Sequence, residues 1–64
     1  MDEKDLLQIS LKRGEIINYQ RASFTDYMVK GELFVVIRDT QWIGIYNMDC
    51  AEYVAYIRAE QREA

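Results

Sequence analysis

The central part of the chain alternates short apolar runs with polar turns, which is the pattern of antiparallel strands. Residues 32–38 are rich in β-branched and aromatic side chains, and residues 39–40 follow as a turn. Residues 41–47 are then expected to be the hairpin partner of that strand. Two more strands are predicted upstream, over residues 15–21 and 23–29, with the second turning at Lys30 and Gly31.

The last part of the chain has the pattern of an amphipathic helix. Asp49 and Glu52 have the spacing of a capping box, which satisfies free N–H groups at a helix start. The apolar residues that follow recur at helical spacing, at Cys50, Tyr53, Val54 and Ile57. The sequence therefore predicts a helix from about 50 to 62. Cys50 is expected on its buried side as a small apolar residue rather than as a reactive thiol.

The first segment fits two structures. Leu7, Ile9 and Leu11 alternate with polar residues, as in a half-buried strand. Against this, Asp5 can cap a helix, and Leu7 and Leu11 also lie at helical spacing before Gly14. We favour a helix over about 3–12 that ends at Gly14.

Together these elements predict one small α+β domain over residues 1–64. It would be an antiparallel meander of three to four strands with an N-terminal and a C-terminal helix.

A resemblance supports an alternative fold. Four features occur in a characteristic order. They are the apolar residue Phe24, a glycine and an acid that begin the strand at 31–36, a tryptophan at the start of 42–44, and a Tyr-Val pair at 53–54. This order resembles that of SH3 domains and covers roughly half of the chain. It differs from that family in the short loop before Trp42 and in the absence of proline before Tyr53. The resemblance implies a small SH3-like β-barrel, here with a C-terminal helix.

Charge and composition narrow the classes of partner and location. Eight basic and eleven acidic residues leave a net charge of −3, which argues against binding to nucleic-acid phosphates. The acidic start of the chain predicts no secretory signal, and the longest apolar run, residues 33–37, is too short to cross a membrane. A single cysteine fits a reducing compartment, so a cytoplasmic location is expected.

The residue types argue against catalysis. The chain has no histidine, the commonest general base, and its one cysteine cannot form a zinc site. Asp26, Glu32 and Asp39 border the predicted strands at turns, where acids serve solubility and local hydrogen bonds. We therefore expect no enzyme activity, no catalytic residues, no cofactor and no metal.

Aromatic residues and two-faced strands point to association instead. Tyrosine and tryptophan are enriched at interface hot spots, and they occur here at Tyr19, Tyr27, Trp42, Tyr46, Tyr53 and Tyr56. Residues 33–37 and 42–46 are apolar on both faces, whereas two short helices cover only one face of a sheet. The sequence predicts a non-catalytic protein-binding module, an inhibitor or adaptor of the phage or mobile-element type, and a homodimer. The expected binding residues are Phe34, Asp39, Trp42, Tyr46 and Tyr56.

A second functional hypothesis is a nucleic-acid-binding β module. Its stacking residues would be Tyr27, Phe34 and Trp42. Its phosphate contacts would come from Lys12, Arg13, Lys30 and Arg38. The acidic net charge makes this alternative the weaker of the two.

Overall fold

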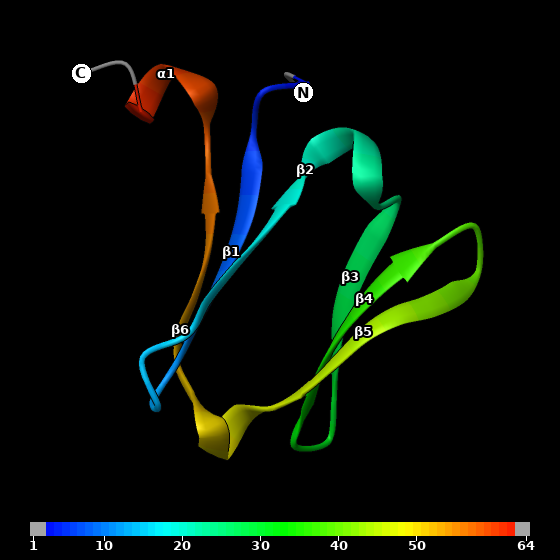
Figure 1. Ribbon diagram of the computed structural model, residues 1–64. Coiled ribbons are helices and arrows are strands. Elements are labelled where there is room, and N and C mark those ends of the chain that lie inside the picture. Colours follow the sequence, from blue (N-terminus) through cyan, green and yellow to red (C-terminus); the bar gives the residue numbers. More distant parts are fainter. Residues whose placement is uncertain (1–2, 63–64) are drawn as a thin grey trace.

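The computed structural model describes residues 3–62, which form six strands in two three-stranded antiparallel sheets. The first sheet has the order β2–β1–β6, with β1 at Leu6–Leu11, β2 at Ile16–Gln20 and β6 at Ala51–Ile57. The second has the order β3–β4–β5, with β3 at Asp26–Lys30, β4 at Leu33–Arg38 and β5 at Gln41–Asn47. The 3₁₀ turns η1 (Arg21–Ser23) and η2 (Met48–Cys50) connect the sheets at opposite ends, and α1 (Ala59–Arg62) follows β6 (Figure 1).

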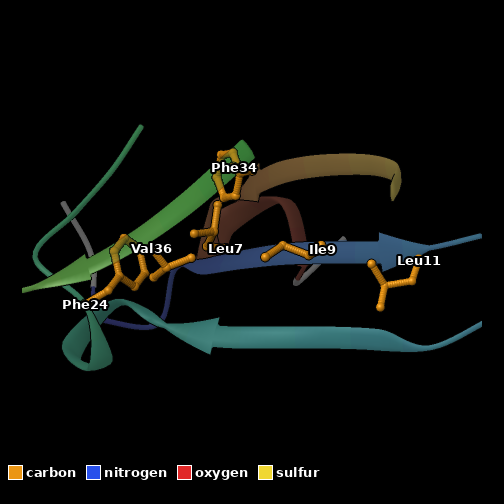
Figure 2. Close-up of a cluster of buried hydrophobic side chains, with 6 residues drawn as sticks. All are labelled: Leu7, Ile9, Leu11, Phe24, Phe34 and Val36. Atoms are coloured by element: carbon orange, nitrogen blue, oxygen red, sulfur yellow. The ribbon is translucent and has the colours of Figure 1, made fainter. Parts of the chain in front are cut away.

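The core lies between the two sheets. Its buried members are Leu7, Ile9 and Leu11 from β1, Phe24 from the segment before β3, and Phe34 and Val36 from β4. Figure 2 shows these side chains gathered along β1 and β4. In each strand they occupy alternate positions, because successive residues of a strand point to opposite faces.

The hairpin predicted over residues 32–47 is confirmed. β4 and β5 pair antiparallel, with Arg38 opposite Gln41, so Asp39 and Thr40 are the two residues of the loop. Their φ angles are 50° and 69°. Two positive φ angles in a two-residue loop are those of a type I′ turn, whose twist matches that of the strands. The β3–β4 loop also has two residues, and Gly31 there has a φ of 61°.

The predicted α+β fold is wrong, and the C-terminal helix is its largest error. Residues 51–57 are the strand β6, and no helix among residues 3–62 reaches seven residues. β6 pairs with β1, where Leu7 lies opposite Tyr56 and Ile9 opposite Val54. Because the central strand of a buried sheet needs hydrogen-bond partners on both edges, this pairing outweighs the helical spacing of the apolar residues.

The capping box is absent for the same reason. The Asn47 side chain accepts a hydrogen bond from the Asp49 backbone N–H at 2.9 Å, and this bond begins η2 rather than a helix. Cys50, which we expected on a buried helical face, is exposed at the end of η2. The expectation of a buried thiol is therefore wrong.

The N-terminal helix is also wrong, because residues 6–11 are the strand β1. The alternation of Leu7, Ile9 and Leu11 was the correct signal, since these three side chains are buried. Gly14 does not end a helix. It lies in the loop between β1 and β2 with a φ of 100°, where its N–H donates to the Leu11 carbonyl at 2.9 Å.

The alternative with a C-terminal helix is not supported either. The predicted SH3-like barrel also included a C-terminal helix, and the strand β6 occupies the residues of that helix. Among residues 3–62 the strands lie in two separately hydrogen-bonded sheets. Apart from short 3₁₀ turns and the four-residue helix α1, the regular structure of residues 3–62 therefore consists of strands.

Gly44 allows the two sheets to approach each other. It is buried in β5, and a Cβ atom there would overlap the Tyr19 hydroxyl from the opposite sheet. The same Cβ atom would lie 3.0 Å from a ring carbon of Tyr46. Glycine is thus required here by space rather than by backbone conformation.

Candidate binding surface

An apolar surface covers the side of the β3–β4–β5 sheet that faces away from the core. The core-facing residues of β4 are Phe34 and Val36, so Leu33, Val35 and Ile37 point to the other side. The pairing register adds neighbours from β3 and β5 on that side. We call this surface the outer face, and its apolar residues are Met28, Leu33, Val35, Ile37, Trp42 and Ile45.

The outer face combines a covered centre with exposed flanks. Val35 in the middle strand has no exposed surface, although no layer of the described residues lies over it. Trp42 is 43% exposed and Ile45 is 53% exposed. The Lys30 ammonium lies 5.2 Å from the centre of the Trp42 ring, so a cation–π contact crosses this face. The side chains of the face therefore cover its centre and leave large apolar groups in contact with water.

The outer side of the opposite sheet differs in having a polar centre. On the β2–β1–β6 sheet, Gln8 donates to the Asn18 side chain at 3.0 Å and accepts from the Tyr53 hydroxyl at 2.7 Å. These polar side chains form cross-strand pairs on the side away from the core. The outer side of the β2–β1–β6 sheet thus has a hydrogen-bonded polar centre among apolar residues such as Leu6 and Ile16. The apolar residues of the β3–β4–β5 sheet, in contrast, are continuous across its three strands.

A groove lies beside the ends of β3 and β6. Its volume is about 800 Å³, and its lining includes Asp5, Arg21, Tyr27, Tyr56 and Arg58. Tyr27 packs against Tyr56 with ring centres 6.4 Å apart, and the Arg21 guanidinium lies 4.8 Å from the centre of the Phe24 ring. Acids and bases alternate around these rings, so the groove has no single charge preference.

Asp5, which lines this groove, has a structural role. It is buried, and its carboxylate accepts hydrogen bonds from the Tyr56 hydroxyl at 2.8 Å and from the Ala59 backbone N–H at 2.9 Å. Its backbone carbonyl accepts from the Arg21 N–H at 3.0 Å. Desolvation raises the pKa of Tyr56, and the hydrogen bond to Asp5 raises it further. The carboxylate therefore joins the start of β1 to the end of β6 rather than standing ready for proton transfer.

A second tyrosine pair bridges the two sheets. The hydroxyl oxygens of Tyr19 in β2 and Tyr46 in β5 lie 2.5 Å apart and share a hydrogen bond. Both rings pack against the core. Desolvation is the largest cause of a strongly raised pKa at Tyr46, and the hydrogen bond with Tyr19 adds to it.

We expect this pair to make the fold sensitive to alkali. The folded state keeps the Tyr46 proton at pH values where the unfolded chain, with its ordinary pKa of 10.0, has lost it. The stability from this group is present below that value and is lost as the pH rises above it. Urea unfolding at increasing pH should show the free energy of unfolding falling by up to about 1.4 kcal/mol per pH unit for this proton. Tyr46→Phe should flatten that dependence, and equal slopes for the two proteins would contradict the assignment.

The structure does not gather the five predicted binding residues on one surface. Phe34 is buried in the core, and Tyr46 packs against it from the inner side of β5. Tyr56 lines the groove, and Asp39 is exposed in the β4–β5 loop. Of the five, Trp42 alone belongs to the outer face.

Sequence reasoning missed the other residues of that face. Met28 and Ile45 were not named as binding residues, yet each is the cross-strand neighbour of Val35. The available signal was the two-faced apolar pattern of residues 33–37. It predicted an exposed face without saying which residues would share it, because the face depends on strand register.

The three aromatic residues of the nucleic-acid hypothesis lie on two sides of the β3–β4–β5 sheet. Phe34 is buried, Tyr27 borders the groove, and Trp42 is on the outer face beneath Lys30. The Tyr27 and Phe34 rings pack together with their centres 5.7 Å apart, but Trp42 lies on the other side of the sheet, so the three rings form no continuous stacking surface.

Comparison with known proteins gives no relative. No protein-family model, no curated protein and no solved structure matches this chain. Within residues 3–62, no helix is long and apolar enough to cross a membrane.

Proposed function

We propose that this chain is a non-catalytic protein-binding module that holds its partner on the outer face. The observation that carries the proposal is the apolar, uncovered side of the β3–β4–β5 sheet, where Trp42 and Ile45 are about half exposed. Contiguous exposed apolar surface on a small protein marks an association site. Tryptophan is among the commonest residues at interface hot spots.

The chemistry of the face defines the kind of partner. Its centre is aliphatic and aromatic, so the partner must offer an apolar surface. Lys30 and Asp26 stand at the two ends of β3 on the same side and supply a charged rim. Apolar centres with polar rims are the ordinary design of protein interfaces. A module of this kind acts as an inhibitor or adaptor by covering part of its partner.

We further propose that two copies of the chain associate. A domain of this size buries little core, and four strands (β2, β6, β3 and β5) are edge strands of their sheets. Two-fold dimers are the commonest closed assemblies. The nucleic-acid alternative is less well supported, because Phe34 is buried, Trp42 lies on the other side of the sheet from Tyr27, and the chain is acidic.

A matched pair of variants tests the role of the outer face. Ile45 is 53% exposed on the outer face, and Ile16, in β2 of the other sheet, is 55% exposed. Each is replaced by aspartate and immobilised beside the wild type, and proteins retained from the native host are identified by mass spectrometry. We expect Ile45→Asp to lose the specific partner and Ile16→Asp to keep it. A buried charge should weaken binding by more than about 2 kcal/mol, or roughly thirtyfold.

The purified partner then gives the quantitative result. Calorimetric titration of the wild type, Ile45→Asp and Ile16→Asp with the partner should show a loss of affinity for Ile45→Asp alone. Equal losses in both variants, or no loss in either, would contradict the outer face as the binding surface. A titration with single-stranded oligonucleotides at low salt serves as the comparison, and tight binding there would favour the nucleic-acid alternative.

A further inference from the structure

The outer edge of β3 is an unpaired strand edge. β3 pairs with β4 on one side, and no described strand pairs with its other side. The two-residue turn after Lys30 makes Lys30 and Leu33 a hydrogen-bonded pair, so alternate residues of β3 direct their backbone groups to β4. The N–H and C=O groups of Tyr27 and Val29 therefore point outward. In agreement with this geometry, the Tyr27 N–H donates to the carboxylate of Asp26 at 2.8 Å instead of to a strand.

The side chains of β3 are complementary to those of a second β3 strand that runs antiparallel to it. Met28 is the central residue, with Asp26 and Lys30 at equal distances on either side. Tyr27 and Val29 flank it on the opposite face, where they are 41% and 61% exposed. If a second β3 is laid antiparallel with its Met28 opposite the first, each acid meets a base and each tyrosine meets a valine.

We propose that two copies of this chain pair antiparallel along β3, with the two-fold axis at Met28. The inference rests on the self-association proposed above and names its interface. Tyr27 and Val29 of opposite copies would exchange the backbone hydrogen bonds that their outward groups offer. Asp26 and Lys30 of opposite copies would then form a non-hydrogen-bonded pair, in which cross-strand side chains lie closest. The Asp26 carboxylate would move from the Tyr27 N–H to the partner's ammonium group.

This arrangement enlarges the binding surface. Two three-stranded sheets would become one continuous sheet, and a two-fold axis normal to it places both outer faces on the same side. From strand spacing and rise, one outer face measures roughly 250 Å² and two measure roughly 500 Å². A standard interface takes about 800 Å² from each partner. Pairing along β3 thus brings the apolar surface closer to the area that a stable complex requires.

Two charge reversals test the proposed pairing. In the proposed dimer, residue 26 of each copy lies opposite residue 30 of the other. Lys30→Glu therefore creates two acid–acid pairs, and Asp26→Lys creates two base–base pairs. Each variant should associate at least roughly tenfold more weakly than the wild type in sedimentation equilibrium. An equimolar mixture of the two variants restores both opposite-charge pairs. It should therefore form a heterodimer of nearly wild-type affinity, which native mass spectrometry identifies by its mass.

Control variants separate the loss of this interface from a general effect of net charge or of unfolding. Lys12→Glu makes the same charge change in the exposed β1–β2 loop and should leave association unchanged. Circular dichroism establishes that each variant is folded. A dimer that both reversals leave intact, or a mixture that fails to form heterodimers, would overturn the β3 interface while leaving self-association standing. A wild-type chain that stays monomeric at high micromolar concentration would overturn both.

Discussion

Replacing Gly44 by alanine is expected to lower the free energy of unfolding by about 2 kcal/mol, the range found for overpacked cores. The new methyl group would overlap the Tyr19 hydroxyl and press against the Tyr46 ring 3.0 Å away. Neither ring can withdraw freely, because both pack against the core and share a hydrogen bond. Urea unfolding followed by tryptophan fluorescence gives the value. The expected fall in melting temperature is about 10 °C for a domain of this size.

A second substitution identifies the cause of that loss. Tyr19→Phe removes the oxygen atom that the new methyl group would meet, so the double variant should recover part of the stability. Tyr19→Phe alone should cost about 1 kcal/mol for the lost hydrogen bond. If the two effects simply add, the close approach of Tyr19 to Gly44 is not the reason for the glycine.

Replacing Asp5 by alanine is expected to be the most damaging change, with a loss of about 3 kcal/mol. The Ala59 N–H, in a residue that is itself buried, would lose its acceptor, and the Tyr56 hydroxyl would lose its partner. Unsatisfied buried groups cost about 1–3 kcal/mol each. A chain of this length has a total stability of only about 3–10 kcal/mol. Thermal unfolding by circular dichroism should show a variant that is close to unfolded at room temperature.

Two milder variants divide this effect into its parts. Asp5→Asn keeps an oxygen that can accept from Ala59 and should lose about 1 kcal/mol. Tyr56→Phe removes one hydrogen bond and leaves the carboxylate bound to Ala59, with a similar loss. If Asp5→Ala proves no worse than Tyr56→Phe, the carboxylate does not hold the end of β6.

Local patterns were sufficient for the β4–β5 hairpin. Residues 33–38 and 41–47 are β-rich runs separated by two turn residues, and each of these features acts within a few residues along the chain. The turn predicted at Lys30 and Gly31 lies one residue later, at Gly31 and Glu32, and its signal was local for the same reason. Neither prediction depended on knowing what else the strands would contact.

The end segments could not be assigned in this way. The apolar residues at 53, 54 and 57 suit a helix face, yet Val54 and Tyr56 also alternate as a strand requires. The choice was made by β1, whose free edge accepts β6 across 40 or more residues of sequence separation. Asp5 shows the same limit, because its partners Tyr56 and Ala59 lie at the far end of the chain.

The sequence by itself determined that the central strands of this protein are apolar on both faces. It also determined the symmetric order of acid, aromatic, methionine, valine and base in β3. Only the tertiary structure decided which face would be covered and which edge would stay open. Burial of Phe34 and Val36 against β1 sent Leu33, Val35 and Ile37 to the outer face. Whether a strand face or edge is exposed depends on how the other strands pair. Some of those pairings, such as β1 with β6, join residues that are distant in sequence, so local patterns do not reveal them.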